Sequence, residues 1–148
     1  MNKDHYLIDL SESERTDFGR VDFADQSEEQ KIFSAIWALE SQINNGGFEQ
    51  YFASWDGDTA TFAPAALRRI GAHRCAGIVE TALEVVSQQA LPVDQTAHQM
   101  LIDSLSDDDR EKLRALNDEF FAYPDNLSDL LFDFVQAHPA VFGPIESE

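Results

Sequence analysis

Carboxylates are the side chains of this sequence with the most evident capacity for chemistry, since 28 acids stand against 10 bases. Two carboxylates can act together as general acid and base, but so many acids leave no pair distinguished by its spacing. A rigid array of carboxylates could instead occupy a basic protein surface in place of phosphates. We assign that array to the last third of the chain, to Asp107, Asp108, Asp109, Glu111, Asp118, Asp125, Asp129 and Asp133.

The spacing of these acids favours a surface on helices. Asp125, Asp129 and Asp133 recur every four residues, which predicts one stripe with steps of about 6 Å on the last helix. A DNA duplex carries a charge about every 1.7 Å, so a stripe of this kind could imitate DNA only together with other helices or in a homodimer. An ordinary solvated polar face is the alternative interpretation.

Nearby bases partly offset the charge of the preceding helix. Asp108 and Lys112, and likewise Arg114 and Asp118, are four residues apart, and we expect them to form ion pairs.

The net charge of −18 is spread unevenly along the chain. Residues 1–30 hold nine acids and three bases, residues 31–80 hold five and four, and residues 81–148 hold fourteen and three. Such a chain should repel nucleic acids and membrane surfaces and attract basic proteins over a distance set by salt. Acidic surfaces also keep ordinary proteins soluble, so charge alone identifies no partner.

Other chemistry has little support in the sequence. The single cysteine, Cys75, excludes an internal disulfide and any cysteine cluster, and we interpret it as a buried structural thiol. The histidines are far apart, phosphate-loop and hydrolase motifs are absent, and Asp56-Gly57-Asp58 is too short for a calcium loop. We therefore expect no catalytic residues, no metal and no cofactor. No apolar run is long enough to span a membrane and no signal region is present, so we expect a cytoplasmic protein.

The element that must position the acids is a corner segment, Asn44 to Phe52, which reads NNGGFEQYF. Two glycines suit a backbone that visits positive φ, and Asn or Gly commonly follows the last turn of a helix. Phe48, Tyr51 and Phe52 then recur at helical spacing. The segment predicts a short helix–helix corner at Asn44–Phe48 with an aromatic face turned inward.

The rest of the pattern predicts an all-α fold, a single compact domain over residues 1–148 with about six or seven helices. We expect helices over about 28–44, 47–54, 64–70, 72–89 and 93–104, one between Ser106 and Tyr123-Pro124, and one between Asp125-Asn126 and His138-Pro139. Ser27-Glu28-Glu29-Gln30 is a capping box, and Ser106 begins a similar one. Residues 1–26 are expected to form a loosely docked acidic arm with a short strand or turn at Tyr6 to Leu10, and the tail after His138-Pro139 to be extended or loosely held.

Over about residues 30–90 the chain resembles a family of small acidic bacterial proteins. The resemblance is carried by the corner segment and by two short motifs downstream of it, Ala66-Leu67 and Ile70-Gly71-Ala72. That family is generally described as a domain of unknown function, and it includes a DNA-mimic protein. The resemblance implies an all-helical fold and a partner such as a helix-turn-helix repressor, which the mimic binds in place of DNA. The resemblance does not identify the binding residues of this chain. The surface of a DNA mimic would be acidic, whereas the corner segment lies in the nearly neutral middle of the chain.

We therefore expect a non-catalytic protein that binds a basic protein surface, most concretely a DNA mimic that occupies the DNA-binding site of a transcription factor or another DNA-binding protein. An immunity- or antitoxin-type inhibitor of a basic nuclease is an alternative with the same charge pattern. An enzyme with a carboxylate site near Glu49 and Trp55 is the alternative of a different class, and it predicts a concave pocket beside the corner segment.

Overall fold

The computed structural model of the chain describes residues 3–12, 25–53, 59–86, 100, 102–103 and 105–143. Within these residues the protein is all-helical, as predicted, with seven helices and no strand. The helices are α1 (Lys3–Ser11), α2 (Glu28–Ala53), α3 (Ala63–Arg69), α4 (His73–Val86), α6 (Asp107–Phe121), α7 (Leu127–Gln136) and α8 (Pro139–Phe142). The helix predicted over 93–104 falls almost wholly outside the described residues. In the part of the chain that the structure describes, no helix combines the length and apolarity that crossing a membrane requires.

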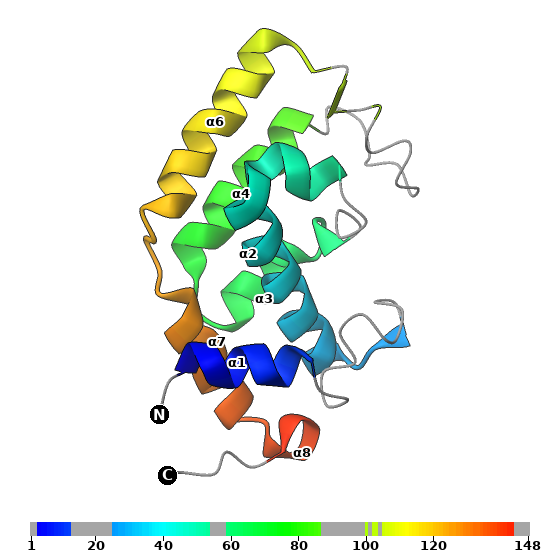
Figure 1. Cartoon of the computed structure of the whole chain (residues 1–148), viewed down its shortest axis with the longest axis vertical. Coiled ribbons are helices and arrows are strands. Elements are labelled where there is room, and N and C mark those ends of the chain that lie inside the picture. Colours follow the sequence, from blue (N-terminus) through cyan, green and yellow to red (C-terminus); the bar gives the residue numbers. More distant parts are fainter. Residues whose placement is uncertain are drawn as a thin grey trace.

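The helices form an elongated body in which α6 and α7 follow one another along one long edge (Figure 1). Helix α2 packs against α3 and α6, and α4 packs against the same two helices. Helix α1 crosses α7 at the lower end of the molecule, where α8 also contacts α7 (Figure 1). Helix α6 is therefore held by the middle of the chain, whereas α7 is held by the terminal helices α1 and α8.

The core is centred on α2, whose apolar stripe and aromatic corner are buried as predicted. The buried side chains of this helix include Ile32, Phe33, Ile36, Leu39, Ile43, Phe48, Tyr51 and Phe52. Phe48 stacks on Phe52 and meets the ring of Phe120 from α6 edge to face, with ring centroids 5.8 and 6.1 Å away. Aromatic pairs in such geometry add to the free energy of burial. The aromatic face of the corner segment is thus what anchors α6.

The predicted corner is a break inside α2. Gly46 is extended (φ −162°), and Gly47 has φ 77° and ψ −171°, a combination that is essentially restricted to glycine. A Cβ atom on Gly47 would lie 2.5 Å from Nδ2 of Asn117 on α6. The Oδ1 atom of the same Asn117 accepts a hydrogen bond from the backbone N–H of Phe48 at 2.9 Å. The glycine is therefore required both by the turn and by the close approach of α6.

The predicted helix caps are confirmed. Ser27 Oγ accepts from the N–H of Gln30, and the Gln30 side chain accepts from the N–H of Ser27 at 3.0 Å. Ser106 Oγ accepts from the N–H of Asp109 at 3.1 Å. Asn126 caps α7 in the same way. These bonds satisfy N–H groups that a helix start leaves without a partner.

Two predictions at the chain ends are wrong. Residues Tyr6 to Leu10 belong to helix α1, because Leu7 and Leu10 are one turn apart and become buried when α1 packs on α7. Pro139 begins a short helix, α8, since proline suits the first position of a helix and Phe142 is fully buried there. Residues 13–24 and 144–148 of the predicted arm and tail lie outside the described part.

Substitution of Gly47 tests the corner. Gly47→Ala should lower the free energy of unfolding by about 1–3 kcal/mol, because alanine is strained at this φ and ψ and its Cβ meets Asn117. Gly77→Ala in α4 is the matched control, since a Cβ there has no atom within 4 Å, and it should stabilise the protein by about 0.5–1 kcal/mol. Urea denaturation of both variants measures the two effects, and equal effects of the same sign would contradict the assignment.

Candidate functional site

Helix α6 presents one acidic line to solvent. Its buried side chains are Leu113, Leu116 and Phe120. Asp107, Glu111 and Asp118 lie on the opposite side, four and seven residues apart, and all three are exposed. Eleven residues of helix extend over about 16 Å, so the line is nearly as long as the helix. The three carboxylates of the first turn also face the positive end of the helix dipole, where negative charge is stabilising.

Helix α7 continues this edge with two acids one turn apart. Asp133 is exposed, whereas Asp129 is half-buried and forms an ion pair with Lys3 of α1 at 3.0 Å. Asp129 also accepts a hydrogen bond from the side chain of its capping residue, Asn126, at 2.9 Å. Asp129 therefore helps to hold α1 and α7 together, which leaves Asp133 as the more accessible of the two.

The ion pairs on α6 differ from those predicted. Lys112 lies 3.9 Å from Asp109, and Arg114 lies 3.4 Å from Glu111, so both pairs span three residues where four were expected. The two pairs predicted at Asp108 and Asp118 do not form, because each base reaches the acid on the preceding turn that is nearer to its own side chain.

Four of the predicted site residues are exposed and have no ion-pair or hydrogen-bond partner for their side chains within the described residues. The four residues, here termed the free carboxylates, are Asp107, Asp108, Asp118 and Asp133. They come from two helices that share one edge of the molecule (Figure 1). Exposed charges without partners retain their field and their hydrogen-bonding capacity for another molecule.

Asp125 lies outside the predicted stripe. It precedes α7, which begins at Leu127, and its Oδ2 accepts from the backbone N–H of Cys75 in the first turn of α4 at 2.9 Å. Burial, and then the negative charge of Asp125, raise the pKa of the buried Cys75 thiol to about 12. The thiol is therefore protonated at neutral pH, which agrees with the structural role that the sequence predicted for it, and Asp125 is a cap for α4.

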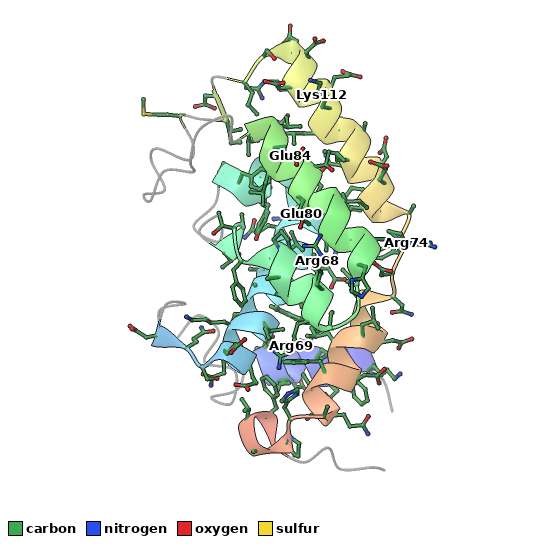
Figure 2. All side chains as sticks on the ribbon, turned by 180° about the vertical axis from the view of Figure 1, so that it is seen from behind. Arg68, Arg69, Arg74, Glu80, Glu84 and Lys112 are labelled. Carbon is green, nitrogen blue, oxygen red and sulfur yellow. The ribbon has the colours of Figure 1, made fainter. Side chains whose placement is uncertain are left out.

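Besides the three bases of α6 itself, basic side chains lie on α3 and α4. Figure 2 shows Arg68, Arg69 and Arg74 on α3 and α4, on the side of the molecule seen from behind. Arg68 pairs with Glu80, and Arg69 pairs with Glu28 of α2 at 3.3 Å. Bases are interspersed with the acids even at the edge, because Arg74 lines a hollow together with Glu119 of α6. By count, α6 and α7 still carry the larger negative charge, −3 and −2.

Glu49, the centre of the alternative enzyme hypothesis, is tied to α6. One of its oxygens lies 3.3 Å from Arg110, which also donates to the carbonyl of Ile102 at 2.8 Å. The other oxygen, Oε1, is buried without a hydrogen-bond partner. Trp55, the second residue of that hypothesis, is outside the described residues. Among the residues that the structure describes, no cluster of three metal-ligating side chains is found. The contacts of Glu49 show a role in placing α6.

A pocket of about 600 Å³ opens where α1, α2 and the start of α7 meet. Its lining includes Asp4, Trp37, Glu40, Asn44, Tyr123 and Asn126. Burial, and then the negative charge of Asp4, raise the pKa of Glu40 above its ordinary value of 4.5. The enzyme alternative predicted a pocket beside the corner segment, and this pocket touches that segment at Asn44, but Glu49 does not line it. Its acids, Asp4 and Glu40, were not predicted; the one signal was that Glu40 directly follows the buried Leu39 on α2.

The comparisons with known proteins give one match. A family model described as DMP19-like protein matches residues 24–138, from the capping box of α2 to the end of α7. The matched region contains all of α6 and α7, and it leaves α1 and α8 outside. Neither the curated proteins nor the solved structures contain a significant match to this chain.

Alanine substitutions should separate a capping carboxylate from a free one. Asp125→Ala should lower the free energy of unfolding by about 0.5–2 kcal/mol, because it removes the acceptor for the Cys75 N–H. Asp133→Ala should change it by less than about 0.5 kcal/mol, as for other exposed sites. Thermal or urea unfolding measures both, and a larger loss at Asp133 would contradict this division of roles.

The raised pKa of Glu40 predicts that Glu40→Gln stabilises the folded protein by an amount that depends on pH. The folded protein binds the Glu40 proton more tightly than the unfolded chain, so stability falls as the pH rises from about 4.5 through the raised pKa. The Gln variant lacks this loss and should be more stable than the wild type at pH 7. Below about pH 4 both side chains are neutral and the advantage should vanish. A constant difference across this range in urea titrations would contradict the expectation.

Proposed function

This chain belongs to the DMP19-like protein family, and from that premise we propose that it is a non-catalytic protein that binds a basic surface of another protein through α6 and α7. The observation that carries the proposal is the set of four free carboxylates on one edge. They stand on helices, α6 packed on α2 and α4 and α7 packed on α1 and α8, so little backbone freedom is lost when a partner binds. Complementary charge then raises the association rate and makes it sensitive to salt.

The most concrete form of this function is a DNA mimic that occupies the DNA-binding site of a transcription factor or another DNA-binding protein. It is supported by the family resemblance of the corner segment together with the charge of α6. The fifteen residues of α6 hold six acids and three bases, a net charge of −3 over about 22 Å. A duplex of that length carries about 13 charges. The edge therefore stands in for one stretch of phosphate backbone, and a homodimer would extend it.

An inhibitor of a basic nuclease is a second candidate, favoured by two exposed aromatic residues. Phe121 at the end of α6 and Tyr123 just after it are 41% and 52% exposed. Aromatic side chains of this kind often carry much of the binding energy of tight protein–protein interfaces. An inhibitor would use them as anchors beside the acidic edge, whereas binding in place of DNA would depend mainly on the carboxylates.

Two variants of equal charge test the proposed surface. The edge variant carries Asp107→Asn, Asp108→Asn, Asp118→Asn and Asp133→Asn. The control variant carries Asp9→Asn, Asp25→Asn, Glu28→Gln and Glu29→Gln, which lie on α1, just before α2 and in the first turn of α2, outside α6 and α7. Each changes the net charge from −18 to −14, and each neutralises two acids in the first turn of a helix.

Both variants and the wild type serve as bait for cytosolic proteins at low and at high salt. The wild type and the control variant should retain the same basic DNA-binding protein, released by salt and displaced by duplex DNA, whereas the edge variant should lose it. Equal retention by all three proteins would contradict the assignment of the surface, and equal loss by both variants would show that only net charge matters. Retention that depends on Phe121, with inhibition of a nuclease, would favour the second candidate.

A further inference from the structure

We propose that the pocket between α1, α2 and α7 binds an arginine side chain of the basic partner protein. This inference rests on the proposed function and adds to it a specific contact, because it names the chemical group that enters a defined cavity. A volume of about 600 Å³ is within the range of ordinary small-ligand sites, and it leaves space for a guanidinium group and its alkyl stem.

The lining of the pocket suits a cation. Its charged side chains are Asp4 and Glu40, and neither lysine nor arginine is among the described residues that line it. The nearest base along the chain, Lys3, is engaged elsewhere: its Nζ lies 3.0 Å from Asp129 and 5.2 Å from the centre of the Phe132 ring. Two acids thus share a concave site without a basic side chain in its wall.

The electrostatic state of Glu40 agrees with this assignment. Its carboxylate is disfavoured first by burial and then by the charge of Asp4. A cation in the pocket would offset both effects, since an opposite charge nearby favours the ionised form. The protein therefore keeps a carboxylate where it opposes folding at neutral pH, and binding a cation is what would compensate it.

The other lining residues favour arginine over lysine. Trp37 offers an aromatic side chain, and Asn44 contributes a side-chain amide oxygen that can accept hydrogen bonds. A guanidinium group is planar, donates up to five hydrogen bonds and stacks on aromatic rings, whereas an ammonium group acts as a compact point charge. A mixed lining of carboxylate, amide and aromatic groups therefore suits a guanidinium group better than an ammonium group.

The pocket also lies beside the proposed binding edge. Tyr123, Asn126 and Ser128 line it, and they belong to the connection between α6 and α7 and to the first turn of α7. A partner that covers the free carboxylates therefore passes the mouth of the pocket. One wall of the pocket is formed by α1, and α1 lies outside residues 24–138, the region that the family model matches.

The test uses N-acetyl-argininamide as a probe and two-dimensional ¹H–¹⁵N NMR spectra of the full chain. The probe should shift the indole N–H of Trp37 and the amides of Ser41 and Asn44, and its neutral isostere N-acetyl-citrullinamide should not. Glu40→Gln should weaken binding about tenfold, because it removes a charge-assisted interaction. Glu29→Gln, a change of the same kind elsewhere on α2, should leave the affinity unchanged. Circular dichroism confirms that both variants are folded.

The outcomes separate this inference from the proposed function. Probe binding should persist in the edge variant, because the free carboxylates do not line the pocket. Shifts confined to α6 and to the part of α7 after Ser128 would overturn the pocket and leave the acidic edge intact. Binding of agmatine, which carries a free guanidinium group but no peptide backbone, together with exclusion of N-acetyl-argininamide would also overturn the inference, since the pocket would then belong to a small amine.

Discussion

The contact between Gly47 and Asn117 is the constraint on which the placement of α6 depends. Gly47 adopts the positive φ that the kink inside α2 requires, and its missing Cβ leaves room for the Asn117 side chain. Asn117 in turn accepts the N–H of Phe48, which the break in the helix leaves without an intrahelical partner. One polar contact thus fixes both the corner and the inner face of α6, and the aromatic packing of Phe48 against Phe120 reinforces it.

The predicted acids of the C-terminal third fall into three groups. Asp109 and Glu111 form ion pairs with bases of α6 itself. Asp125 and Asp129 are used inside the protein, the first as a cap for α4 and the second as a partner of Lys3. The free carboxylates make no such contact and remain available at the surface. Because the inner face of α6 is fixed by Asn117 and Arg110, its outer face has a fixed direction too. Helix α6 therefore presents its acids in a fixed direction, which is what the proposed recognition of a basic partner would require.

Local signals in the sequence were sufficient for the helices that begin with a cap or end at a glycine. Ser27, Ser106 and the Gly46-Gly47 pair act within a few residues, so they predicted the starts of α2 and α6 and the corner. Long-range contacts were beyond the sequence. Helix α1 forms because Leu7 and Leu10 are buried against α7, more than a hundred residues away. The roles of Asp125 and Glu40 likewise depend on helices that only the fold brings together.

The most direct measurement for the central claim is carboxylate footprinting of the chain, free and bound to its captured partner. Carbodiimide coupling of an amine labels accessible acids, and mass spectrometry locates each label. The account predicts that Asp107, Asp118 and Asp133 lose reactivity in the complex while Asp25 and Glu29 keep theirs. Protection of Asp25 and Glu29 with unchanged labelling of α6 and α7 would contradict it, because the partner would then bind the opposite side of the molecule.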